Sequence, residues 1–559
     1  MKTFISILNI VALCTFGINA TQAQTPNFAW SMQLGSADVD WANGMATDGS
    51  GNSMIVGRFE GTLDVGDTTL TSAGNSDILL AKYNNQGSLL WAVRAGGTSS
   101  DEGLDIATDA AGNSIITGYF RSQADFGDTT LTGTSLLNDI FIAKYDDGGN
   151  LLWAEKAGGS GSDLGYEIAT DSAGNSFVTG GFNGSAAFGD TTLVSDLFIN
   201  DVFVAKYDTQ GELLWATHGG GPSSDDGFVI TTDHIGNTVV AGRFTGEATF
   251  GNITLPGDGN GFDIFVVKYD ANGNQLWATY ANGPDSDWAT GIATDETGNI
   301  FLTGYFDDTL LFDNVTLTNI GLEDVFLAKY DPDGNLLWAT SLGGPETDRA
   351  TGITTTTPGN ISITGYFSGS AGFGQTTLTS SGGSDIFVTE IDGTGNPLWA
   401  QQAGGIADDW GHDIATDSDG FHVLTGVFND TAVFSDIAHA SMGGGDIFIA
   451  QLETGVVTDV EFEYEMHQPF RLQQNYPNPF NTSTSIPYSI EKPGQVEVTI
   501  YNTLGQAVRS LVSEFHAPGT YARTWDGRDN AGRLLHSGLY FYRFKMGDKT
   551  RTQQMLFVK

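Results

Sequence analysis

The sequence predicts an all-β protein, a seven-bladed β-propeller followed by a small immunoglobulin-like β-sandwich. Three observations carry this prediction. One unit of 61 or 62 residues recurs seven times, each unit holds four short runs typical of β-strands, and the composition shifts near residue 455. No helical period of 3.6 residues appears in the repeated region.

The N-terminal residues 1–23 are typical of a signal peptide. Lys2 supplies the positive charge of the first region, an apolar stretch follows from Phe4 to Phe16, and Thr21-Gln22-Ala23 is typical of the small-residue cleavage site. The apolar stretch is too short to span a bilayer, which needs about 20 residues. The chain's one cysteine, Cys14, lies within it, so the exported protein is expected to have no disulfide. We expect an extracellular or outer-membrane-surface location without a transmembrane segment.

The predicted propeller covers residues 25–454, and four registers mark its units. A tryptophan and, ten residues later, an aspartate recur, as do a Gly-Xaa-Phe motif and a second aspartate that opens the last apolar run. The tryptophans are Trp30, Trp91, Trp153, Trp215, Trp277, Trp338 and Trp399. The first aspartates, called ring aspartates below, are Asp40, Asp101, Asp163, Asp225, Asp287, Asp348 and Asp409.

Each unit is predicted to form four antiparallel strands. Residues 104–120 form two β-rich runs around a Gly-Asn turn, residues 139–155 form two more, and ADFGDTTLT between them suggests an extra hairpin. The first segment, 27–30, has no partner within its own unit, and the seventh unit ends one strand short at Leu452. We therefore expect the first segment to complete the last blade and close a ring. A solenoid is the alternative, but it would need atypical capping units.

The repeated residues are interpreted as structural. Each tryptophan is expected to wedge between adjacent blades, and each ring aspartate to fix a Gly-rich loop by accepting backbone N–H bonds. Carboxylates on one face could also attract Ca²⁺. Two turns resemble calcium loops but lack the Glu at position twelve, and their candidate ligands are Asp331, Asp333, Asp417 and Asp419. No other cofactor is predicted.

Two strings carry a resemblance to a known family. DIFIAKYDDGGNLLWAEKAGG (139–159) and DVFLAKYDPDGNLLWATSLGG (324–344) resemble SBBP-type β-propeller repeats. The resemblance implies an exported bacterial protein without an assigned reaction.

A polar linker is expected at 455–471 and a second domain at 472–559, where alternating runs are separated by Gly, Asn and Pro. NYPNPFN, IYNTLGQAV, WDGRDNAGRLLHSGLYFYRF and QMLFVK resemble the C-terminal sorting domain of type IX secretion substrates. The same sandwich resembles the immunoglobulin-like part of flagellar hook-capping proteins. The resemblance to sorting domains implies recognition by the type IX secretion machinery. Its motif residues are Tyr476, Pro477, Asn478, Pro479, Phe480, Asn481 and Gly538.

Charge and motifs narrow the function classes. A formal net charge of −44 excludes an ordinary nucleic-acid binder. No HExxH, GxSxG or paired-cysteine zinc spacing appears. A secreted or surface-displayed protein that binds a glycan or protein ligand is the preferred interpretation, with contacts on variable loops such as 132–138 and 255–262. A glycan hydrolase or lyase is the alternative, and a quinoprotein is ranked last because the mature chain lacks a cysteine pair.

Overall fold

The computed structural model describes residues 25–453 and 470–558, apart from short gaps at 258, 357–358, 473–474, 491–492, 503–505 and 547–548. The predicted signal peptide and most of the predicted linker lie outside the described residues. The chain divides into two compact units, 1–455 and 456–559. All described elements are strands, so the predicted all-β class is confirmed. No helix among them is long and apolar enough to cross a membrane.

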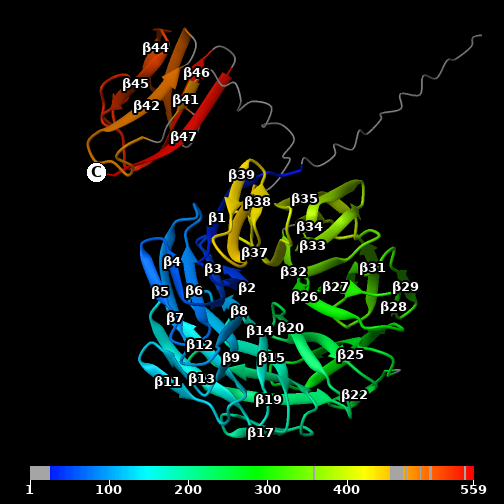
Figure 1. The fold of residues 1–559 in the computed structure, drawn as a ribbon. Coiled ribbons are helices and arrows are strands. Elements are labelled where there is room, and N and C mark those ends of the chain that lie inside the picture. Colours follow the sequence, from blue (N-terminus) through cyan, green and yellow to red (C-terminus); the bar gives the residue numbers. More distant parts are fainter. Residues whose placement is uncertain are drawn as a thin grey trace, which may run out of the picture. The chain divides into compact units, whose positions relative to one another are not determined.

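The described strands of the first unit form seven antiparallel sheets arranged around a centre, three of four strands and four of six, and two separate two-stranded hairpins (Figure 1). The strands nearest the centre are β2 (Trp41–Thr47), β8 (Glu102–Thr108), β14 (Leu164–Thr170), β20 (Asp226–Thr232), β26 (Trp288–Thr294), β32 (Asp348–Thr356) and β36 (Trp410–Thr416). The second strands are β3 (Ser53–Phe59), β9 (Ser114–Arg121), β15 (Ser176–Phe182), β21 (Thr238–Phe244), β27 (Ile300–Phe306), β33 (Asn360–Phe373) and β37 (His422–Phe428).

The third strands are β6 (Asp77–Tyr83), β12 (Asn138–Tyr145), β18 (Asp201–Tyr207), β24 (Asp263–Tyr269), β30 (Asp324–Tyr330), β34 (Thr376–Ile391) and β40 (Asp446–Leu452). The outer strands are β7 (Leu89–Ala95), β13 (Leu151–Gly159), β19 (Leu213–Gly220), β25 (Gln275–Asn282), β31 (Leu336–Leu342), β35 (Pro397–Gly405) and β1 (Phe28–Leu34). Each third strand has a sheet neighbour on both sides and packs against adjacent blades. It therefore has the near-continuous apolar pattern of a strand buried on both faces, as in Asp77–Tyr83, where every residue is buried.

The predicted extra hairpin is present between the second and third strands. The hairpins are β4 (Thr62–Val65) with β5 (Thr68–Thr71), β10 (Gln123–Phe126) with β11 (Thr129–Thr132), β16 (Ser185–Phe188) with β17 (Thr191–Val194), β22 (Glu247–Phe250) with β23 (Ile253–Pro256), β28 (Thr309–Phe312) with β29 (Val315–Thr318), and β38 (Thr431–Phe434) with β39 (Ile437–Ala440). In the sixth blade it is continuous with β33 and β34. Several hairpins also pair with the preceding blade's outer strand, as β16 does with β13. This pairing joins neighbouring blades by backbone hydrogen bonds.

The ring closes with the strand that the sequence leaves over. β1 pairs antiparallel with β40 from Phe28↔Leu452 to Leu34↔Ile447, in a sheet ordered β1-β40-β37-β36. This is the pairing expected from the sequence. The N-terminal segment thus covers a strand edge that would otherwise be open to another chain.

A belt of threonine hydroxyls joins the innermost strands. Thr47 Oγ1 donates to the carbonyl of Thr416, Thr108 Oγ1 donates to that of Thr47, and the pattern repeats from blade to blade. The remaining donors are Thr170, Thr232, Thr294, Thr355 and Thr416, the last of which donates to the hydroxyl of Thr354. The belt gives partners to polar groups on the exposed edge of each sheet.

The second unit is the predicted sandwich. One sheet contains β41 (Phe470–Leu472), β42 (Thr484–Ile490) and β45 (Gly519–Trp525). The other contains β43 (Gly494–Asn502), β44 (Ala507–His516), β46 (Gly538–Met546) and β47 (Lys549–Phe557). Its core includes Tyr488, Val498, Trp525, Tyr542 and Phe557. The predicted fold class, a propeller followed by an immunoglobulin-like sandwich, is confirmed.

Candidate functional site at the mouth of the central channel

The seven repeated tryptophans lie between blades. Trp91 on β7 stacks over Gly149 in the next blade's hairpin turn, and its indole N–H donates to the carbonyl of Asp147 at 2.9 Å. Trp153, Trp215, Trp277 and Trp338 donate to the following blade in the same way. The two tryptophans beside the ring closure differ, because Trp30 donates to Gln451 and the fully buried Trp399 to Glu390. The chain ends replace a hairpin turn there, so Trp399 has no turn carbonyl to bind.

The ring aspartates fix the loops between blades. Asp101 accepts the backbone N–H groups of Gly97 at 2.7 Å and Arg121 at 2.9 Å. The other ring aspartates that accept the N–H four residues earlier are Asp40, Asp163, Asp225, Asp348 and Asp409. Asp287 has no such bond, and neither of its carboxylate oxygens has a partner among the described residues. This geometry favours the structural interpretation of the ring.

Each ring aspartate lies beside the aspartate that opens a third strand. An ideal Cβ placed on Gly96 would lie 2.9 Å from Asp77 Oδ1 and 3.0 Å from Asp101 Oδ2, so glycine is required at this junction. Burial raises the pKa of these carboxyls, to about 6 for Asp101 and about 7 for Asp225. Each pair therefore retains a proton more readily than exposed aspartates do.

The four calcium candidates occupy ordinary hairpin turns. Asp331 Oδ1 accepts the backbone N–H groups of Asp333 and Asn335, and Asp417 Oδ1 accepts those of Asp419 and Phe421. Within the described part of the chain, no group of three or more His, Cys, Asp or Glu residues could hold a metal ion. Calcium binding at these turns stays an untested alternative, and the backbone contacts of Asp331 and Asp417 favour the structural interpretation.

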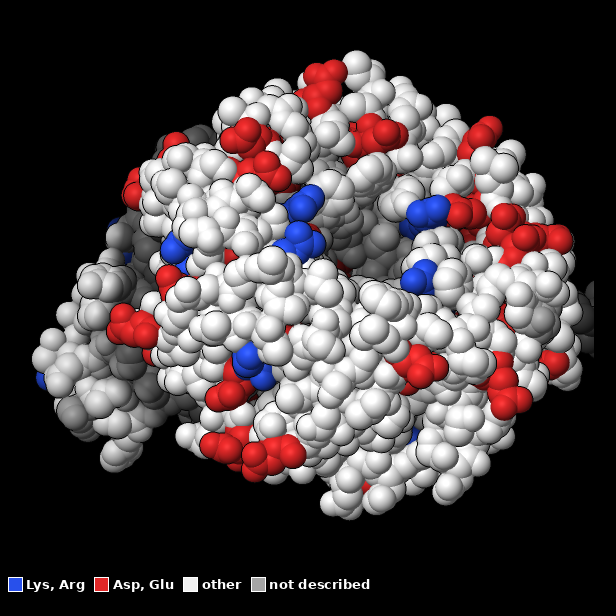
Figure 2. All heavy atoms as spheres, turned by 60° about the horizontal axis from the view of Figure 1, so that its bottom comes forward, with Lys and Arg blue, Asp and Glu red and all other residues white. Residues whose placement is uncertain are grey.

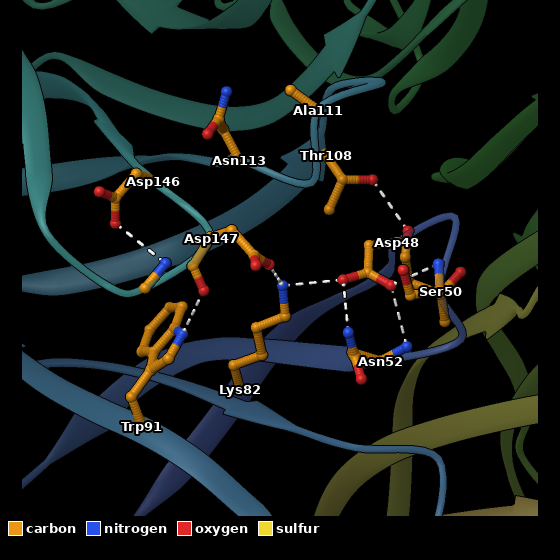
Figure 3. A network of polar contacts seen from close by, with 12 residues as sticks. Asp48, Ser50, Asn52, Lys82, Trp91, Thr108, Ala111, Asn113, Asp146 and Asp147 are labelled. Atoms are coloured by element: carbon orange, nitrogen blue, oxygen red, sulfur yellow. Dashed lines mark hydrogen bonds and ion pairs between the residues drawn. The ribbon is translucent and has the colours of Figure 1, made fainter.

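In five blades, a buried lysine forms an ion pair at the end of the third strand that lies away from the ring aspartates. Lys82 on β6 forms ion pairs with Asp48 at 2.8 Å and with Asp147 of the next blade (Figure 3). Although burial alone would raise it, the Lys82 ammonium and the turn N–H groups hold the pKa of Asp48 below its usual value. The corresponding pairs are Lys144–Asp109, Lys206–Asp171, Lys268–Asp233 and Lys329–Asp295. These repeated ion pairs belong to the scaffold.

Each blade has a different pair of residues at the mouth of the central channel. The residue after each ring aspartate lies opposite the Xaa of Gly-Xaa-Phe in the ladder between the first two strands. These mouth pairs are Trp41–Arg58, Glu102–Tyr119, Leu164–Gly181, Asp226–Arg243, Trp288–Tyr305, Arg349–Tyr366 and Trp410–Val427. The molecule is hollowed at its centre, and Lys and Arg atoms surround the hollow (Figure 2). The mouth is thus chemically varied although the scaffold around it repeats.

Two sectors of the mouth are already filled by internal contacts. Arg243 bonds Asp226 through two nitrogens, and its guanidinium lies 4.0 Å from the Phe262 ring centre and 4.2 Å from that of Trp288. Arg349 bonds Glu323 through two nitrogens. In a third sector, Trp41 stacks on His412 at 5.1 Å and lies 5.8 Å from Trp410. All three of these rings are half-buried.

Three carboxylates lie deeper in the channel, at a repeat position that is acidic in only three of the blades. Asp105, Glu167 and Asp413 each accept a backbone N–H of the next blade's innermost strand, from Ile168, Ile230 and Met45. Burial raises the pKa of Asp413 to about 7. Burial and the charge of Asp413 raise the pKa of Asp105, and burial and the charge of Asp105 raise that of Glu167. A bulge in each ladder, such as that between Gly103 and Asp105, positions these residues.

The residues of the predicted sorting motif all lie in the sandwich, and their role in sorting stays a prediction. Phe480 is buried and stacks on Phe557 at 4.9 Å, whereas Tyr476 is 82% exposed. Pro477, Asn478, Pro479 and Asn481 are exposed, and Gly538 begins β46.

The mouth was not predicted from the sequence. The sequence does contain a signal for it, because Trp41, Trp288, Trp410 and Trp525 are the tryptophans that stand outside the repeat register. Three of them directly follow a ring aspartate, at a position that the repeat does not otherwise fix. The expected loop contacts at 132–138 and 255–262 remain untested, and residue 258 lies outside the described residues.

Comparisons with known families agree with the two parts of the fold. Residues 276–305 match the Beta-propeller repeat family, SBBP. Residues 481–550 match the FlgD Ig-like domain family. These matches support a β-propeller repeat protein with an immunoglobulin-like C-terminal domain, and neither of them is to a type IX sorting domain.

Two curated proteins resemble this chain. An uncharacterized WD repeat-containing protein, L264 of Acanthamoeba polyphaga mimivirus, is 25% identical over 72% of this chain and 36% of its own length. The regulatory protein FlaEY of Caulobacter vibrioides is 27% identical over 28% of this chain and 17% of its own length. The chain thus spans about a third or less of the length of these relatives.

Two of the solved structures that match this chain do so over most of its length at low identity. A fungal alcohol oxidase of the AA5 family in complex with copper is 13% identical, with a TM-score of 0.40, and covers 96% of this chain and all of its own. PorZ of Porphyromonas gingivalis, an essential bacterial surface component of the type-IX secretion system, is 12% identical, with a TM-score of 0.17, over 95% of this chain and all of its own.

Proposed function

We propose that this protein is an extracellular binding protein whose ligand contacts the mouth of the central channel. The observation that carries the proposal is the sector formed by Trp41, Trp410 and His412, which are half-buried aromatic rings at positions that vary in an otherwise regular repeat. Ligand sites are concave and mostly apolar or aromatic, with a few placed polar groups. A scaffold role would not require these positions to vary among the blades.

The proposal is tested by titrating the mature chain against soluble oligosaccharides and against extracellular proteins of the producing cell. Isothermal titration calorimetry with the wild type should find a ligand, and Trp41→Ala or Trp410→Ala should weaken its binding at least tenfold. Phe515→Ala is the matched control, because Phe515 is an aromatic residue of the sandwich that is 69% exposed. Equal loss of binding in the control, or unchanged binding in both mouth variants, would contradict the proposal.

Export is the second part of the proposal. The signal-peptide pattern and the resemblance of residues 472–559 to type IX sorting domains support secretion by that route, followed by release or surface anchoring. In a host that carries the type IX machinery, a chain truncated before residue 472 should remain in the periplasm while the full chain reaches the medium or cell surface. Export of the truncated chain to the same extent would contradict this route.

A glycan hydrolase or lyase is the second candidate, favoured by the non-repeated carboxylates of the channel. A carboxyl that holds its proton near neutral pH, as Asp413 does, can act as a general acid. Reducing-end assays on polysaccharides decide between the candidates. If the protein cleaves a polysaccharide, and Asp413→Asn abolishes the cleavage without loss of ligand binding, the function is catalysis rather than binding alone.

A further inference from the structure

Arg58 is the one propeller arginine in the described residues whose guanidinium is left without a hydrogen bond. Arg94, Arg121, Arg243 and Arg349 each donate at least one, to Asp77, Asn138, Asp226 and Glu323. Arg58 donates none to any residue that the structure describes, and its Nε is buried without an acceptor. A guanidinium carries five N–H donors, so its capacity for an anion is unused.

The carboxylate closest to Arg58 is already bound by other groups. Glu102 Oε1 lies 3.7 Å from Arg58 Nε, beyond hydrogen-bond distance. That oxygen accepts from the amide of Asn43 at 2.9 Å, and Glu102 Oε2 accepts from the hydroxyl of Tyr119 at 2.8 Å. These neutral donors hold Glu102 away from a close pair with Arg58. The Arg58 side chain is 31% exposed, so its outer nitrogens can be reached from the channel.

Aromatic and acceptor groups surround this guanidinium. The Arg58 guanidinium carbon lies 5.9 Å from the Trp41 ring centre, and Trp41 in turn lies beside His412 and Trp410. His412 Nδ1 contacts the carbonyl of Ala42 at 2.7 Å, so that nitrogen carries the proton and Nε2 is an acceptor. Burial lowers the pKa of His412 to about 4, so the ring is neutral at neutral pH.

We propose that this sector binds a carboxylate-bearing sugar. The outer nitrogens of Arg58 receive the carboxylate in a charge-assisted, bidentate contact. The apolar face of the sugar ring packs against Trp41 and Trp410, and a sugar hydroxyl donates to His412 Nε2. The inference rests on the proposed function, and it names the chemical class of the ligand at the same site.

The chemistry selects this class over a neutral sugar. Arg58 would lose its water on binding a neutral ring and gain no anion, which costs free energy, whereas a carboxylate completes its hydrogen bonds. The high negative charge of the whole protein repels anions at a distance, but salt screens this repulsion beyond about 10 Å. Recognition must therefore come from contacts at the mouth itself.

The test uses trigalacturonate and its methyl ester, in which each charged carboxylate is replaced by a neutral ester on the same sugar rings. Calorimetry with the mature full chain should give at least tenfold tighter binding of the acid. Arg58→Gln should abolish this difference, while Arg58→Lys should restore part of it. Lys156→Gln is the matched control, because Lys156 is an exposed cation that bonds the carbonyl of Thr132. Circular dichroism confirms that each variant is folded.

The outcomes separate this inference from the proposed function. Equal affinity for acid and ester, with binding that still requires Trp41, would overturn the anionic class and leave the channel mouth as a binding site. Loss of the acid preference in Lys156→Gln as well as in Arg58→Gln would also overturn it, because general surface charge would then explain the preference. Absence of binding to both sugars would overturn the inference, whereas the proposed function fails only if no ligand depends on the mouth.

Discussion

Single residues in this propeller fall into two groups that lie at different places in the blades. The repeated Trp, Asp and Lys side chains bind backbone or one another between blades, as Trp91 and Asp101 do. The non-repeated side chains, such as Arg58 and Trp410, gather where the innermost strands begin. Substitutions should accordingly affect either stability or ligand binding.

Replacement of Trp399 with Ala should reduce the free energy of unfolding by about 3 to 5 kcal/mol, because it leaves a cavity and takes away the hydrogen-bond donor of Glu390 Oε2. Leu90→Ala is the control, since Leu90 is 50% exposed and its loss should cost about 0.5 kcal/mol or less. Urea titration measures both. Similar costs for the two variants would contradict the burial argument.

The paired carboxyls predict a pH dependence of stability. Folding raises the pKa of Asp225 from 3.8 to about 7, so the folded state binds more protons than the unfolded state between these values. Stability should therefore fall as pH rises from 4 through 7. Asp225→Asn should flatten this pH profile, because an amide does not titrate in this range. It also loses one of the two backbone N–H bonds that the carboxylate accepts, from Gly221 and Thr245.

Asp190→Asn removes the same charge from an exposed site and is the matched control for this effect. If the two variants had equal pH profiles, the buried pair would not be the source of the dependence.

At the scale of elements, the ring depends on the pairing of β1 with β40. Deletion of residues 25–34 should lower the melting temperature and produce dimers, because the free edge of β40 can pair with a second chain. A synthetic peptide of residues 25–36, added in excess, should restore the monomer and the melting temperature. Sedimentation velocity measures the species. A deleted chain that stayed monomeric and equally stable would show that closure does not need β1.

Strand positions could be predicted from the sequence because the same apolar pattern recurs in every unit. The pattern at Asp77–Tyr83 thus supports the strand predicted at Asp263–Tyr269, and the reverse. The closure could be predicted from the unpaired first segment. The mouth was not predicted, because Trp41 and Arg58 occupy positions that the repeat leaves variable, and they meet only through ladder register. The carboxylates Asp105 and Asp413 are far apart in the chain, and the ring brings their charges into range of each other.

For the molecule as a whole, the turn geometry predicts that metal chelation has no effect on stability. Asp331 and Asp417 already accept backbone N–H groups, so EDTA should leave the melting temperature unchanged. Differential scanning calorimetry with and without EDTA measures this. A fall of several degrees that Ca²⁺ alone reverses would instead support a calcium role for the turns.

The closing blade also determines how the propeller would carry mechanical load. The chain leaves β40 toward the sandwich, and β40 lies between β1 and β37 with ladders on both sides. A pull along this strand would have to shear two ladders at once, rather than unzip one edge. An anchor attached beyond residue 453 would therefore transmit force into a strand that resists extraction.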